Sequence, residues 1–121
     1  MSSNVWQKSG TVRNMFPEPG TTNGALTGAW LYKDSPQTTY QATVSGTGAV
    51  TATVVIEYSN DVNPATGLGN ALSTVGGTIT LTGTTVTSDG FTTSNAPWKW
   101  SRARTTAISG TGATVQVYQG V

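Results

Sequence analysis

Few side chains in this sequence could do acid–base chemistry. The carboxylates are Glu18, Asp34, Glu57, Asp61 and Asp89. A glycosidase needs two carboxylates that face a sugar at a fixed separation, and Glu57 with Asp61 is the best pair available. Glu57 falls on the polar side of an alternating strand and Asp61 in the loop after it, a pattern typical of a solvated strand face followed by an Asx turn. We therefore predict no catalytic residue.

Metal and cofactor chemistry is equally poorly represented. The stretch Ser59–Pro64 holds several oxygens, but calcium takes about 6–8 ligands with more carboxylate than this, so the stretch indicates a turn. The sequence contains no His and no Cys, which removes imidazole bases, thiolate nucleophiles, disulfides and the usual zinc ligands. We predict no metal site, no cofactor and no small-molecule substrate.

Charge is scarce throughout the 121 residues. Charged residues make up 9% of the chain, against roughly 25% in an ordinary soluble domain, and the formal net charge is +1. Such a charge argues against nucleic acid as a partner. The longest apolar runs are far too short for a membrane span, and no charged stretch followed by an apolar one opens the sequence, so we expect neither a membrane span nor a secretory signal. Thr, Ser and Gly together fill 50 of the 121 positions.

The most informative stretch runs from Pro97 to Thr105. On a strand, Trp98, Trp100, Arg102 and Arg104 share one face. Three arrangements reconcile tryptophans with arginines: a β-bulge that turns Trp98 inward while the arginines point outward, a protein interface, or nucleic-acid stacking. The remaining basic residues are too few to sustain the third. We expect Trp100, Arg102 and Arg104 to contact a protein partner if the face is an interface.

The elements that must position these residues fall into two parts. Residues 1–28 hold Pro17 and Pro19, four glycines and no sustained periodicity, which indicates an extended N-terminal arm. Because an extended arm covers more area than a compact body, we expect it to reach along a neighbouring subunit, with Trp6 and Phe16 as apolar anchors. Residues 29–121 form the second part, a β domain.

The β signal of residues 29–121 is alternation. Tyr40, Ala42 and Val44 are expected inward, then Val50 to Tyr58 at every second position, then Ile79 with Leu81, and Val115 with Val117. The string Ser-Gly-Thr-Gly-Ala occurs at 45–49 and again 64 residues later, at 109–113, and predicts a hairpin turn in each place. The two copies indicate either pseudo-symmetry or shared turn chemistry. Seven or eight short strands with Gly turns indicate a β-sandwich or small barrel.

The order of several strings resembles a family of small tailed-phage virion proteins over about residues 40–120. The matching strings are Val54–Asp61, Gly77–Gly83, Ser88–Phe91, Ala96–Arg104 and Ile108–Val115. One departure is that relatives of this type often carry a Trp soon after Ser-Asn-Asp, where this chain has Val62-Asn63-Pro64 and an insertion-like stretch, Ala65–Ala71. The packing of that loop is therefore open.

The resemblance implies an all-β protein, an antiparallel β-sandwich of jelly-roll or immunoglobulin-like type. It implies a non-enzymatic capsid decoration (cement) protein that bridges major capsid subunits on the virion surface, is made in the host cytoplasm, and associates with copies of itself as a dimer or trimer. A neck or tail component, a receptor-binding component and a carbohydrate-binding β-sandwich module are the alternatives.

Overall fold

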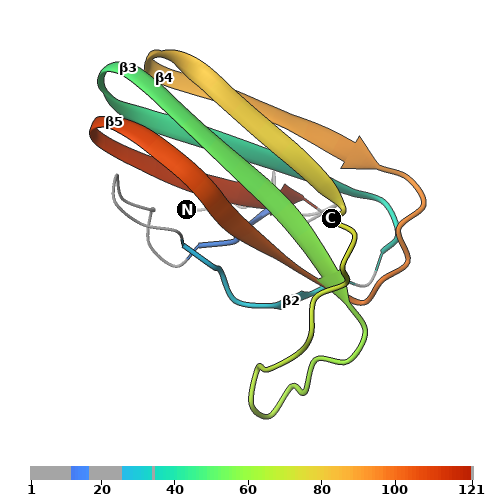
Figure 1. Cartoon of the computed structure of the whole chain (residues 1–121). Coiled ribbons are helices and arrows are strands. Elements are labelled where there is room, and N and C mark those ends of the chain that lie inside the picture. Colours follow the sequence, from blue (N-terminus) through green and yellow to red (C-terminus); the bar gives the residue numbers. More distant parts are fainter. Residues whose placement is uncertain (1–11, 17–25, 34, 121) are drawn as a thin grey trace, which may run out of the picture.

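The computed structural model describes residues 12–16, 26–33 and 35–120, and every regular element in these ranges is a β-strand. The strands are β1 (Val12–Asn14), β2 (Leu31–Tyr32), β3 (Thr38–Ser59), β4 (Gly77–Thr93) and β5 (Trp100–Gly120). They form one antiparallel sheet in the order β1-β5-β3-β4, and β2 also pairs with β5 (Figure 1). The all-β prediction is confirmed. The described residues contain no helix that is long and apolar enough to cross a membrane.

The strand count differs from the expectation of seven or eight because three strands are unusually long. β3, β4 and β5 have 22, 17 and 21 residues, against a usual five or six. Each of the three long ribbons turns back at the same end of the molecule, so that its two halves lie over one another (Figure 1). The pairing of β3 with β4 shifts register at that corner, between Ser45 and Ala49. One continuous sheet is therefore folded over on itself.

The predicted hairpin turns at 45–48 and 109–112 are wrong. Residues 38–45 do not pair with residues 49–59; both halves of β3 pair with β4 on one side and β5 on the other. The two Ser-Gly-Thr-Gly-Ala copies instead form neighbouring corners, with Thr47 opposite Thr111. Gly48 has a φ of 72°, and a Cβ on Gly110 would lie 2.8 Å from the carbonyl oxygen of Ala49. The corner needs glycine because side chains rarely adopt this backbone and would not fit this approach.

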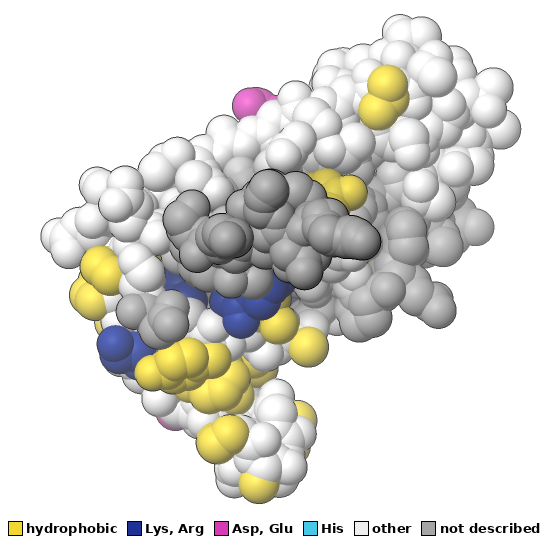
Figure 2. Space-filling model, turned by 180° about the vertical axis from the view of Figure 1, so that it is seen from behind, with side chains coloured by type: hydrophobic (Ala, Val, Ile, Leu, Met, Phe, Trp, Pro, Cys, Tyr) yellow, Lys and Arg dark blue, Asp and Glu magenta, His cyan; other side chains and the backbone are white. Residues whose placement is uncertain are grey.

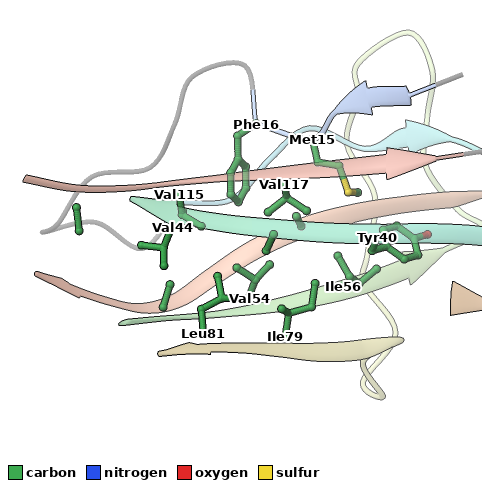
Figure 3. Packing of buried hydrophobic residues seen from close by; sticks show 14 of the residues in the cluster. Met15, Phe16, Tyr40, Val44, Val54, Ile56, Ile79, Leu81, Val115 and Val117 are labelled. Carbon is green, nitrogen blue, oxygen red and sulfur yellow. The ribbon is translucent and has the colours of Figure 1, made fainter. Parts of the chain in front are cut away.

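The core lies between the two halves of the folded sheet. Figure 3 shows Val44, Val115 and Val117 from one half facing Val54, Ile79 and Leu81 from the other. The residues predicted to point inward are at most 4% exposed: Tyr40, Ala42, Val44, Val50, Ala52, Val54, Ile56, Tyr58, Ile79, Leu81, Val115 and Val117. Alternation along the strands thus predicted these core residues correctly.

Residues on both sides of the predicted boundary at residue 28 lie in the same sheet. β1 pairs with the end of β5, with Val12 opposite Gly120. Met15 and Phe16 follow β1 into the core and are 1% and 0% exposed. The amide of Gly28 donates to the carbonyl of Ala103 at 2.8 Å. The described parts of residues 1–28 therefore contribute strand pairing and core packing to residues 29–121.

Candidate partner interface

The face of β5 that carries Trp100, Arg102 and Arg104 lies on the outside of the folded sheet. Its register with β3 runs without a break from Trp100 opposite Ser59 to Thr105 opposite Val54. The bulge in β5 comes only after Thr105, so no bulge separates the tryptophan from the arginines. The alternation predicted for these three residues is confirmed.

One glutamate holds both arginines. Arg102 Nε donates to Glu57 Oε1 at 2.7 Å, and Arg104 Nε donates to Glu57 Oε2 at 3.1 Å. The Glu57 side chain is 8% exposed, whereas those of Arg102 and Arg104 are 23% and 37% exposed. Glu57 was expected on a solvated strand face; it is buried because its register position places it directly opposite Arg102. The cluster leaves one positive charge uncompensated among these three side chains.

Aromatic residues from residues 26–33 complete the cluster. The guanidinium carbon of Arg102 lies 4.4 Å from the ring centroid of Trp30, which is a cation–π contact. Two residues further along each segment, Tyr32 pairs with Trp100, and their rings meet edge to face with centroids 5.2 Å apart. Trp30 is buried, and Tyr32 is 49% exposed. We call Tyr32, Trp100, Arg102 and Arg104 the aromatic–arginine surface.

Segments that carry further exposed apolar side chains adjoin this surface. The amide of Lys99 donates to Asn60 Oδ1 at 2.9 Å, and the amide of Lys33 donates to the carbonyl of Lys99, so the segments around 33, 60 and 99 adjoin. Trp98, next to Lys99, is 37% exposed, and Leu68 in the loop from 60 to 76 is 72% exposed. Figure 2 shows, from behind, hydrophobic side chains beside Lys and Arg side chains toward one end of the molecule. Most of the rest of the described surface in that view is neither charged nor hydrophobic.

The loop between β3 and β4 is closed at its base by Asp61. Its carboxylate accepts from Ser59 Oγ at 2.7 Å, from the Asn70 amide at 2.8 Å and from Asn70 Nδ2 at 2.9 Å. The bonds from Ser59 and then Asn70 lower the pKa of Asp61 to about 2. Asn63 Oδ1 accepts from the amide of Ala65, which confirms the Asx turn predicted in this stretch. The carboxylates of Glu57 and Asp61 thus hold separate structural contacts.

A buried polar group lies beneath this end of the sheet and was not predicted. Lys33 is 1% exposed; its Nζ donates to the carbonyls of Ala96 and Ser35 and lies 5.4 Å from the ring centroid of Tyr58. Burial, and secondarily the charge of Lys99, lower the pKa of Lys33. Burial also raises the pKa of Tyr58. These contacts fix the position of the segment that carries Tyr32.

A second buried polar group ties the two halves of the sheet together. Gln119 is 0% exposed, and its Nε2 donates to Ser101 Oγ at 2.5 Å and to Tyr40 Oη at 3.4 Å. Arg13 donates to Gln119 Oε1 and, at 2.6 Å, to the carbonyl of Tyr32. The arginine of β1 is therefore linked to the aromatic–arginine surface through the backbone of β2.

The five residues predicted as interface contacts are placed differently. Trp100, Arg102 and Arg104 lie together on the outer face, Phe16 lies in the core of its own chain, and Trp6 is outside the described residues. Sequence reasoning missed Trp30, Tyr32 and Glu57 as neighbours of these arginines. Tyr32 was missed because the register of its segment with β5 is not encoded in any local pattern.

Comparisons with protein families, with curated proteins and with solved structures find no match to this chain.

Proposed function

We propose that this chain is a non-enzymatic virion structural protein, a capsid decoration protein that bridges major capsid subunits on the surface of a phage head. The resemblance of residues 40–120 to small virion proteins suggests the role. The observation that carries the proposal is the aromatic–arginine surface, because Trp, Tyr and Arg are the residue types that dominate binding energy at protein interfaces. In fold terms, we propose that the folded sheet is a β-sandwich whose layers share their strands at one corner.

The arrangement of charge supports a protein partner for this surface. Glu57 accepts one hydrogen bond from the Nε of each arginine, Arg102 and Arg104. A guanidinium held in this way presents a rigid fork of donors that matches a carboxylate or backbone carbonyls. Tyr32 and Trp98 add exposed aromatic area close by. A partner with acidic or carbonyl groups beside an apolar pocket would complement both features.

The low charge of the remaining surface is consistent with the same role. The outward positions of β3 and β4 are largely Thr and Ser, such as Thr43, Ser88 and Thr92. The free-energy cost of removing a neutral hydroxyl from water at an interface is smaller than the cost for a charged group. A stable interface buries about 800 Å² on each partner, more than the aromatic–arginine surface supplies alone. The neutral rows around it can provide the rest at low desolvation cost.

Binding to phage heads tests this proposal. Purified chain is mixed with expanded heads that lack it, and the bound fraction is measured by co-sedimentation over a range of concentrations. We expect saturable binding that raises the temperature at which the heads rupture, since a ligand of the assembled state stabilises it. The variant carrying Tyr32→Ala and Trp98→Ala should bind at least about tenfold more weakly, because a hot-spot residue is worth about 1–2 kcal/mol or more.

Val86→Ala is the matched control. Val86 is 57% exposed and lies on β4 at the corner, whereas the aromatic–arginine surface lies on β2 and the beginning of β5. Its truncation should therefore leave binding unchanged. Equal weakening by both variants would mean that the aromatic–arginine surface is not the contact. Failure of the unmodified chain to bind any head would refute the decoration role. Binding to an immobilised glycan that is lost on Trp100→Ala would favour the carbohydrate-binding alternative instead.

A further inference from the structure

The outer edge of the sheet along β4 has no partner strand. β3 is the only strand that pairs with β4 in the part of the chain that the structure describes, and Figure 1 shows β4 as the outermost ribbon of the folded sheet. Alternate residues of an edge strand point their N–H and C=O groups away from the sheet, and these groups can pair with another strand.

The two halves of this edge differ in how they are protected. Proteins block edge pairing with charged residues, inward-pointing charges, proline or irregular backbone. The half from 86 to 93 carries Asp89, which lies opposite the inward residue Ala42 and is itself exposed. The half from 77 to 84, Gly-Thr-Ile-Thr-Leu-Thr-Gly-Thr, contains no charged residue and no proline, and its β-branched residues favour strands.

The side chains of residues 77–84 are suited to continuing the sheet. Thr78, Thr80, Thr82 and Thr84 are exposed on the outer face, while Ile79 and Leu81 are each 2% exposed on the inner face. An antiparallel copy centred on Thr80 would set Thr78 beside Thr82 of the second copy, and Ile79 beside Leu81 of the second copy. Thr–Thr and aliphatic pairs of this kind stabilise neighbouring strands. The same segment is therefore complementary to itself.

We propose that two copies of this chain associate through Gly77–Thr84, which pair antiparallel about a two-fold axis and join the two sheets into one. A second copy is the favoured occupant because a two-fold contact uses the same neutral segment twice and brings no like charges together. The other edge offers a poorer match, since its described strands β1 and β2 have 3 and 2 residues, and β1 carries Arg13. This inference deepens the self-association expected under the proposed function but concerns the purified chain alone.

Two double variants with equal added charge test the proposal by sedimentation velocity. Thr78→Lys with Thr82→Lys places like charges face to face in the paired segment, which is unfavourable across strands. Ser88→Lys with Thr92→Lys adds the same charge at the same spacing to exposed positions in the other half of β4. We expect a dimer for the unmodified chain and for the 88/92 variant, and a dissociation constant raised at least about tenfold for the 78/82 variant.

Hydrogen exchange supplies the second readout. In the dimer, the amides of 77–84 that point away from β3 should be protected, and the 78/82 variant should lose that protection while its circular dichroism stays unchanged. If that variant does not fold, Thr80→Lys, which places two charges near the axis, replaces it. A monomeric unmodified chain at about 1 mM, open-ended oligomers, or equal dissociation of both double variants would overturn the proposal. If the edge amides are protected only on phage heads, a strand of the capsid protein and not a second copy of this chain pairs with the edge. Head binding itself is measured separately, by co-sedimentation.

Discussion

Truncating Phe16 separates a role in the chain's own core from a role in reaching a neighbour. Phe16 is 0% exposed, and a buried phenylalanine removes about 150–250 Å² from water. At about 25 cal/mol per Å², this burial corresponds to about 4–6 kcal/mol as an upper bound. Because measured Phe→Ala losses in cores are about 3–5 kcal/mol, we expect Phe16→Ala to lower the free energy of unfolding by about 4 kcal/mol.

Urea denaturation followed by fluorescence and circular dichroism measures this loss. A domain of this size is stabilised by about 5–15 kcal/mol in all, so the variant should remain folded but with a much lower midpoint. Val12→Ala is the control from the same segment, because Val12 is 67% exposed and its truncation should cost less than about 0.5 kcal/mol. A Phe16→Ala loss below about 1 kcal/mol would refute the placement of residues 12–16 in the core. Weaker head binding with unchanged stability would favour the original idea that Phe16 anchors a partner.

Three further predictions concern the corner, the ion pair and the loop. At the corner, Gly110→Ala should lower the free energy of unfolding by about 3 kcal/mol or more, because a Cβ there meets the Ala49 carbonyl. Gly48→Ala should lower it by about 1 kcal/mol, because Gly48 has a positive φ but open space around it. Equal losses of the two variants in thermal denaturation would contradict this difference. Glu57→Gln leaves two partly buried arginines without a counter-charge and should lower the free energy of unfolding, measured by urea denaturation, by about 1–3 kcal/mol. Asp89→Asn, at an exposed position, should leave it nearly unchanged. Equal values for the two variants would show that the ion pairs of Glu57 with the arginines do not stabilise the fold. The pKa of Asp61 is about 2 in the folded chain against 3.8 ordinarily. Its contribution to the stability of the fold is therefore fully present above about pH 4 and is lost as the pH falls through 2. An NMR titration midpoint near 4 for Asp61 would rule out its bonds to Ser59 and Asn70.

Alternation along the chain was sufficient to predict the inward residues of β3 and those named in β4 and β5, but it gave no sign that Met15 and Phe16 also lie in the core. In β3 the inward set from Tyr40 to Tyr58 was correct because the side chains of a strand alternate faces whatever the strand pairs with. The same rule placed Trp100, Arg102 and Arg104 on one face. These predictions depend only on neighbours along the chain.

Features set by distant parts of the chain could not be predicted in this way. A Gly-rich stretch between two alternating runs gives the same local signal for a hairpin turn and for a corner; the difference lies in whether 38–45 pairs with 49–59 or with β4 and β5. The burial of Glu57 likewise depends on its register with Arg102 of β5, which lies far away in sequence. The candidate surface was therefore predicted in part, through β5, and its aromatic neighbours were missed.

The strand order has a consequence for the timing of biosynthesis. β5 is made after the other four strands, yet it lies between β3 and β1, and the β5 residue that pairs with Thr39 is Gly120. Until β5 has left the ribosome, β3 has β4 on one side and an open edge on the other. Contacts across such sequence separations make folding slow, and the open edge exposes the nascent chain to aggregation. Production of this protein should therefore depend on an intact β5, and removing even part of β5 should leave the chain largely insoluble.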